Sequence, residues 1–442
     1  MVRLLAEQSL EAKETSSARA LTIKMDTVII LLLSLMPFNF SDVDKTGLDL
    51  NIDNGIDKVA RVIWFLVSVI TVLVLKPVLY KRIFLRSTTL VKFLIFYMAV
   101  ILIGLVANGI GVIGYYRLCE YLILILALNT LSAAIEKYGK DFAVELFSRW
   151  VLFTAVLVLL VITFGLTVSP HHFYALETQG RLRLGGNAYS PNFIGMVFGL
   201  GSLAAFYLYC GASKFTTKLV FAVWCIALLV ALYFTGSRTA QFSVVIAFVA
   251  WFFFSIGTGS KVFLVLSGLV FLVPLGFIFH ESLVASVLPM IGKGETPTYD
   301  LLTLNNRSVV AEVGLQGAFE NWGLGVGFVE GVKQYYRSNF TQSYWLPPHT
   351  HNAIIESFLS GGIISLLIMV VILGGVLRSL IGCVFFKKNR SAIFLAVFSI
   401  PLVLGCITMT IFGGVYTVLT FWFFSLALFS WSKNERKNPI YI

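Results

Sequence analysis

Long apolar runs separated by short polar stretches dominate the chain. A helix needs roughly 20 mostly apolar residues to cross a bilayer, and most of the runs approach or reach that length. The twelve apolar segments cover residues 27–40, 61–77, 89–107, 112–134, 150–168, 191–211, 218–235, 239–257, 262–280, 352–377, 391–411 and 414–431. This pattern predicts an all-α polytopic membrane protein with about 12 transmembrane helices.

The polar stretches between these segments suggest a domain organisation. Residues 1–26 form a polar tail without the basic, apolar and small-residue pattern of a cleaved signal peptide, and Met25 is an alternative start. We expect residues 27–432 to form one transmembrane domain and residues 433–442 a second tail. Outer loops are expected at 169–190 and at 281–350, and the second of these is the only long hydrophilic insertion between spans.

Composition and charge agree with a membrane protein. The chain of 442 residues is 58% hydrophobic and 12% charged, and its mean hydropathy is +0.89. If both tails are cytoplasmic, the inner side holds 21 lysines and arginines and the outer loops hold nine. The positive-inside rule therefore favours this orientation and accounts for most of the net charge of +11, so we do not expect nucleic-acid binding. The nine outer cations oppose the bias, which makes them candidates for function.

Three outer arginine motifs are candidates for binding a phosphate group. Arg181 and Arg183 stand beside a Gly-Gly turn, where side chains and backbone amides can both donate to an anion, although an ordinary solvated loop is the alternative. Arg238 lies in the short joint 235–240 between two apolar segments. An arginine at a membrane boundary faces a partner or a wet cavity, or else snorkels to the surface.

The large insertion holds the third arginine, Arg307. A run of alternating glycines follows at 321–327, without the strand, helix and spacing of a dinucleotide-binding loop. We interpret it as a turn that returns the insertion to the membrane. Insertions of this length in compact proteins are commonly functional.

The stretch 347–365 changes abruptly from a polar, histidine-bearing segment to an apolar one. Asn352 can cap the helix that follows, which places His351 at the water boundary, where a neutral imidazole can accept a proton from a hydroxyl. A structural role for the histidine is the alternative. Glu356, five residues on, points away from the His351 face and is not an obvious orienting partner. Gly361 and Gly362 indicate close helix contact.

Metal binding is not expected. His349 and His351 lack a third or fourth ligand at suitable spacing, and all five cysteines lie within or beside apolar segments. Arg117 and Glu120 stand three residues apart in a predicted helix, so they can form a structural ion pair.

Taken in order, these motifs resemble the O-antigen ligase and polysaccharide polymerase family of bacterial inner-membrane glycosyltransferases. The resemblance rests on the stretch Arg183 to Asn192, on Gly236-Ser237-Arg238, on Arg307, and on His351-Asn352 leading to Gly362. It covers about residues 170–375. Ser365 departs from the family pattern, which often has Gly or Thr there.

The resemblance implies a metal-independent, inverting glycosyltransferase without a cofactor, acting in lipopolysaccharide biosynthesis. Its donor would be a glycan on undecaprenyl diphosphate, and its acceptor hydroxyl would belong to lipid A-core in a ligase or to a second lipid-linked glycan in a polymerase. Arg238 and Arg307 would bind the diphosphate and His351 would be the general base, at the periplasmic face of the inner membrane. Arg181 or Arg183 would contribute to donor or acceptor binding, and His349 and Asn352 are further candidate substrate-binding residues.

Ligase and polymerase share these motifs, so both remain open. A polytopic transporter or lipid flippase is the alternative of another class, since twelve spans with both termini inside are common in transporters. Transporters often show paired halves with broken helices at matching places, and no such internal repeat is visible in the sequence.

Overall fold

The structure is a computed structural model, and it describes six main stretches of the chain. These are residues 88–176, 182–185, 190–257, 307–340, 349–385 and 389–432, together with Ile63, Leu66, Val67, Ile70, Gly259, Ser260 and Pro347. The predicted tails 1–26 and 433–442, the segments 27–40 and 262–280 and most of 61–77 lie outside the described residues.

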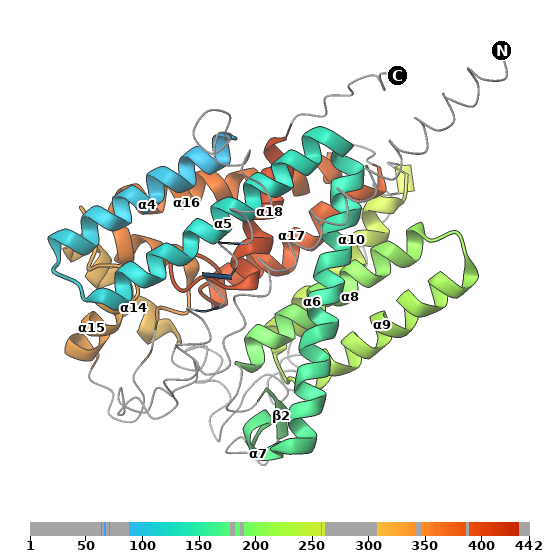
Figure 1. The fold of residues 1–442 in the computed structure, drawn as a ribbon, viewed down its shortest axis with the longest axis horizontal. Helices are drawn as coiled ribbons and strands as arrows, with labels where there is room; N and C mark the ends of the chain where they lie inside the picture. Colours follow the sequence, from blue (N-terminus) through green and yellow to red (C-terminus); the bar gives the residue numbers. More distant parts are fainter. Residues whose placement is uncertain are drawn as a thin grey trace, which may run out of the picture.

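The regular secondary structure of the described residues is helical apart from one small hairpin (Figure 1). The helices are α4 (Thr89–Ala107), α5 (Val112–Tyr138), α6 (Lys140–Val168), α7 (Pro170–Phe173), α8 (Pro191–Gly211), α9 (Phe215–Phe234), α10 (Arg238–Ser255), α14 (Arg307–Glu320), α15 (Glu330–Asn339), α16 (Ala353–Phe385), α17 (Arg390–Thr408) and α18 (Val418–Trp431). Strands β1 (Tyr174–Leu176) and β2 (Leu182–Leu184) pair antiparallel, with Ala175 opposite Arg183.

Eight of the described helices are long and apolar enough to cross a membrane, namely α4, α5, α6, α8, α9, α10, α16 and α17. The apolar helix α18 is shorter, with 14 residues. These nine helices coincide with nine of the predicted segments, so the chain is a multi-pass membrane protein. The described residues do not test the full count of twelve.

The helices α5 and α6 differ from the prediction at their junction. Residues 135–149 lie between two of the predicted apolar segments, yet α5 continues to Tyr138 and α6 begins at Lys140, so only Gly139, with φ of +87°, separates the two helices. Glu145 and Arg149 form an ion pair of 2.6 Å across one turn of α6. Charged residues with good helix propensity thus extend the helices beyond their apolar parts.

Helix packing brings distant parts of the sequence together (Figure 1). Helix α8 packs against α6 and α9, α10 packs against α17, and α16 packs against α4, α17 and α18. Large aromatic side chains fill the contacts, with Tyr207 of α8 stacked on Phe394 of α17 at a centroid distance of 4.5 Å. The C-terminal helices therefore complete a bundle begun by the N-terminal ones.

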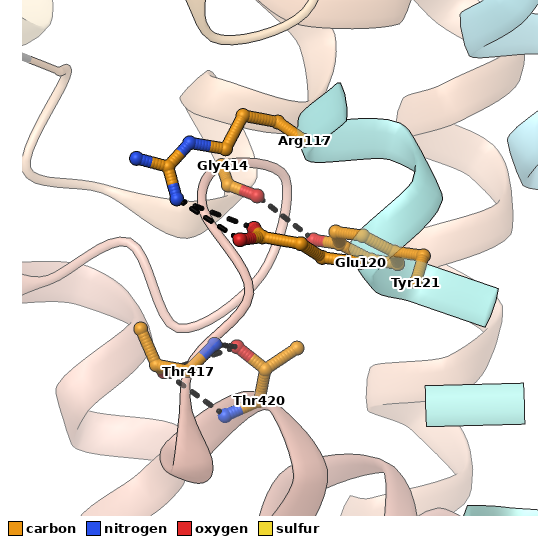
Figure 2. A network of polar contacts seen from close by, with 6 residues as sticks. All are labelled: Arg117, Glu120, Tyr121, Gly414, Thr417 and Thr420. Atoms are coloured by element: carbon orange, nitrogen blue, oxygen red, sulfur yellow. Dashed lines mark hydrogen bonds and ion pairs between the residues drawn. The ribbon is translucent and has the colours of Figure 1, made fainter. Parts of the chain in front are cut away.

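The loop between α17 and α18 is tied to α5 and to α16, and Figure 2 shows its contact with α5. Tyr121 of α5 donates a hydrogen bond of 3.0 Å to the carbonyl of Gly414, and Ser360 of α16 donates one of 3.0 Å to the carbonyl of Gly413. Beside Tyr121, the predicted Arg117–Glu120 ion pair is present at 3.1 Å and is largely buried. The loop consequently holds α5 and α16 in a fixed relation at one end of the bundle.

Helix α16 is interrupted at Gly361 and Gly362, where φ is −140° and +69°. The turn at 321–327 fits into this break, because the amide of Val326 donates to the carbonyl of Leu359 and the amide of Ile363 donates to the carbonyl of Trp322, both at 2.8 Å. A side chain at position 362 would collide with the backbone of this turn. The predicted turn is present. The two glycines were expected to mark contact with another helix: Gly361 does face Ile101 of α4, whereas Gly362 meets the backbone of the turn.

Candidate functional site

The hairpin β1–β2 carries Arg183 onto the turn between α9 and α10. The Nε atom of Arg183 donates a hydrogen bond of 2.9 Å to the carbonyl of Thr235. Its side chain lies so close to Gly236 that a Cβ atom there would be 3.1 Å from Nε, and Gly236 adopts φ of +59°. A glycine thus lets the arginine lie flat against the turn.

The same turn is tied to the start of α8. Ser237, which is buried, donates a hydrogen bond of 3.0 Å from Oγ to Oδ1 of Asn192, and its amide donates to Oγ1 of Thr235 at 3.2 Å. Arg238 follows as the first residue of α10 and is half-buried. The first two arginine motifs of the sequence therefore form one structural unit.

Arg307 is the first residue of α14, and its electrostatic surroundings place it near two other candidates. Burial, followed by the positive charge of Arg183, lowers the pKa of the Arg307 guanidinium. Burial, then His349 and then Arg307, lower the pKa of His351 well below its ordinary value of 6.5. The charge of Arg183 thus acts on Arg307 and the charge of Arg307 acts on His351, so electrostatics links three residues that are far apart in sequence.

His351 has an unusual backbone conformation, with φ of +54° in a residue other than glycine. Left-handed conformations of such residues are uncommon and concentrate at functional sites. Asn352 caps α16 as predicted, with Oδ1 accepting from the amides of Ile354 at 2.9 Å and Ile355 at 3.1 Å. The Nδ1 atom of His349 accepts from the amide of His351 at 3.1 Å, and the two rings meet edge to face.

Thr350 and Glu356 stabilise the turn at residues 349–352 by hydrogen bonds. The amide of Thr350 donates a hydrogen bond of 2.8 Å to Oε2 of Glu356, whose side chain is fully enclosed. Oγ1 of Thr350 donates to the carbonyl of Asn352 at 2.7 Å and accepts from the amide of Asn352 at 3.2 Å. Glu356 therefore orients His351 through the backbone of the preceding residue.

Sequence reasoning missed this role of Glu356, because it considered only contact between the carboxylate and the imidazole. The available signal was a carboxylate one turn inside an apolar helix, which is costly to bury unless it accepts hydrogen bonds. Three helices begin at the candidate residues, α10 at Arg238, α14 at Arg307 and α16 directly after Asn352. Helix N-termini and arginine side chains both favour anions.

The structure gives different information on Arg181, on Asn352 and on metal binding. Arg181 lies outside the described residues, so only Arg183 of that pair can be placed. Asn352 uses its side-chain oxygen to cap α16, which makes it a structural part of the turn. Among the described residues, no group of three or more His, Cys, Asp or Glu side chains lies together as a metal site would require.

Comparison with known proteins gives a match to a family model. No curated protein matches the chain. Residues 221–370 match the family model described as O-antigen ligase, and this segment includes Arg238, Arg307 and His351 but not Arg183. The predicted resemblance to the O-antigen ligase and polysaccharide polymerase family is thereby confirmed over residues 221–370.

Proposed function

We propose that the protein is an integral-membrane glycosyltransferase of the O-antigen ligase type. It transfers a glycan from undecaprenyl diphosphate to an acceptor hydroxyl of lipid A-core, on the periplasmic side of the bacterial inner membrane. The observation that carries the proposal is that Arg307, at the start of α14, interacts electrostatically with both Arg183 and His351, a half-buried histidine with a left-handed backbone and a lowered pKa. Two cations suit a diphosphate, and a neutral imidazole suits a general base.

The arginines bind the leaving group in this proposal. Arg238 and Arg307 hold the diphosphate oxygens, and Arg183 adds positive charge from the hairpin. As the bond between the anomeric carbon and the diphosphate oxygen breaks, negative charge builds up on that oxygen, and fixed cations stabilise it. The arginines thereby supply the charge stabilisation that the departing diphosphate needs.

His351 activates the acceptor. Its low pKa keeps the imidazole neutral near pH 7, so one ring nitrogen can accept the proton of the acceptor hydroxyl while the oxygen attacks the anomeric carbon. Attack opposite the leaving diphosphate inverts the configuration of that carbon. The products are the new glycosidic bond, undecaprenyl diphosphate and a protonated His351, which then loses its proton to water.

The test is complementation of a deletion strain with the wild type, His351→Ala and Arg238→Ala at matched membrane expression. Surface glycan and lipid-linked glycan are both resolved on gels. Loss of surface glycan with accumulation of long lipid-linked chains supports the ligase, whereas loss leaving only single repeat units supports a polymerase that joins lipid-linked units.

Full activity in both variants would refute the catalytic roles. If the variants blocked movement of the lipid-linked unit across the membrane and left glycan assembly intact, the protein would be a transporter or flippase. Matched expression matters, because a variant that fails to reach the membrane would imitate loss of activity.

A further inference from the structure

Helix α14 and the turn after it pack against α16 well beyond its first turn, although the sequence places them in a long hydrophilic insertion. The amide of Val326 bonds to Leu359, six residues after the start of α16, and the carbonyl of Trp322 accepts from Ile363, ten residues after it. With a rise of 1.5 Å per residue, these contacts lie about 9 to 15 Å along the helix.

Contacts with α4 also show how far the turn 321–327 reaches along the membrane helices. A side chain at Gly104, one turn before the end of α4, would meet the carbonyl of Leu324 at 2.9 Å. The side-chain amide of Asn108, which caps the end of α4, donates to the carbonyl of Gly325 at 3.1 Å. The turn therefore reaches past the ends of two membrane helices and into the space between them.

The break in α16 depends on this turn for its hydrogen bonds. Backbone groups within a bilayer must be satisfied by protein, because lipid offers no partners. Here the turn supplies a donor to Leu359 and an acceptor for Ile363, which the interrupted helix cannot supply itself. Such irregular backbone is tolerated at membrane depth where protein encloses it.

The outward face of α14 changes in polarity along its length. Its first half exposes Ser308 and Glu312, and its second half exposes Leu315, Gln316, Phe319 and Glu320, followed by Trp322 in the turn. Phe319 and Trp322 are 63% and 64% exposed. Spacings of three and four residues put Ser308, Glu312, Leu315 and Phe319 on one face of the helix, and Gln316 and Glu320 on the neighbouring face. A face that is polar at one end and apolar at the other fits a helix that enters a membrane.

The neighbouring helices continue the apolar end of this face. Ile103 and Val106 of α4 and Ile364 and Leu367 of α16 are exposed large apolar residues, and the turn 321–325 lies between the parts of α4 and α16 that carry them. Glu320 lies on a different side of α14, where Gln316 donates to it at 2.9 Å and Tyr335 donates to it at 3.4 Å.

We propose that residues 315–324 dip into the bilayer as a half-membrane hairpin, with the acyl chains of one leaflet covering Leu315, Phe319, Trp322 and Leu324. This contact concerns the lipid and does not depend on the reaction catalysed. Helix α14 then runs from the aqueous boundary at Arg307 into the leaflet.

Site-directed spin labelling of the full-length protein in phospholipid nanodiscs tests the proposal. All five native cysteines are replaced, and four variants of this protein each carry a single new cysteine, at Glu312, Leu315, Phe319 or Trp322. Collision rates are measured with oxygen, which partitions into lipid, and with a soluble nickel chelate. Leu367→Cys serves as the lipid-facing reference, and Arg337→Cys on α15 as the water-facing one.

Positions 315, 319 and 322 should resemble position 367, and position 312 should resemble position 337. Nickel accessibility at 315, 319 and 322 equal to that at 337 would overturn the proposal. Hydroxyl-radical labelling of the unmodified protein in the same nanodiscs is a second test, which stays valid if a substitution or spin label disturbs folding. Phe319 and Trp322, corrected for intrinsic reactivity, should then be oxidised as slowly as the exposed Phe252 of the α10 span, and rates several-fold higher than that of Phe252 would refute the immersion.

Discussion

The substitution Glu356→Ala tests how the His351 turn is held. It removes the acceptor that the amide of Thr350 uses, at a distance of 2.8 Å, and leaves that amide buried. An unsatisfied buried donor costs about 1–3 kcal/mol. The left-handed backbone of His351 is itself unfavourable, so the turn would relax to another conformation once this hold is lost.

If that relaxation displaces the imidazole, the competent fraction of the protein falls by the same free energy. A change of 1–3 kcal/mol corresponds to a loss of about 5-fold to 150-fold in the transfer rate. Glu356→Gln keeps an oxygen acceptor for Thr350 in a side chain of similar size, so it should retain most of the activity. Binding of undecaprenyl diphosphate should change little in either variant, because the arginines that we propose for it lie on other elements.

Two measurements separate positioning from substrate binding. The transfer rate is measured as the initial rate of glycan transfer in membranes from complemented cells, and binding is measured with undecaprenyl diphosphate and the purified protein. The reasoning is refuted if Glu356→Ala transfers glycan at the wild-type rate, or if Glu356→Gln is as impaired as Glu356→Ala. Loss of binding in Glu356→Ala would show a general collapse of the site. If the wild type did not bind undecaprenyl diphosphate at all, the proposed function would fail instead.

Three further predictions follow from the same geometry. Arg307→Ala should lower the transfer rate on the order of 100-fold and weaken binding of undecaprenyl diphosphate, whereas Arg337→Ala, an exposed arginine on α15, should change neither. Because the pKa of His351 is lowered in the folded protein, the transfer rate should stay constant as the pH falls from 8 toward 6.5 and decline only at more acid pH, and a rate that halves near pH 6.5 would contradict this. The free energy of unfolding should likewise fall below about pH 6.5, because the unfolded state then binds more protons than the folded state. Gly362→Ala should lower the melting temperature in detergent, since it adds a side chain at φ of +69° against the turn, whereas Gly374→Ala in the same helix meets no neighbouring atom and should have no such effect.

The sequence predicted features that depend on local patterns. Apolar runs located nine of the described helices, the spacing of Arg117 and Glu120 gave the ion pair, and Asn352 before an apolar run gave the cap. Each of these is decided by residues within one or two helical turns. The order of the motifs also indicated the family, because short functional motifs can be recognised in a sequence without knowing how the chain packs.

Features that depend on tertiary contact were not predictable in this way. The hydrophobic pattern runs unbroken through Gly361 and Gly362, so nothing local shows that a turn from the preceding insertion completes the helix there. The proximity of Arg183 to Arg307 arises from a hairpin folded over the α9–α10 turn. The role of Glu356 depends on a turn whose shape the sequence does not specify.

The segment that matches the O-antigen ligase family does not build the candidate site alone. Arg183 comes from before residues 221–370, and the loop containing Gly413 and Gly414 comes from after them. A side chain at Gly413 would strike the backbone of Ser357, the residue next to Glu356, and the Gly414 carbonyl is held by Tyr121 of α5. The carboxylate that fixes the His351 turn is thus confined by elements from both ends of the chain. The matched segment supplies Arg238, Arg307 and His351, and the rest of the bundle determines whether these residues meet in one geometry.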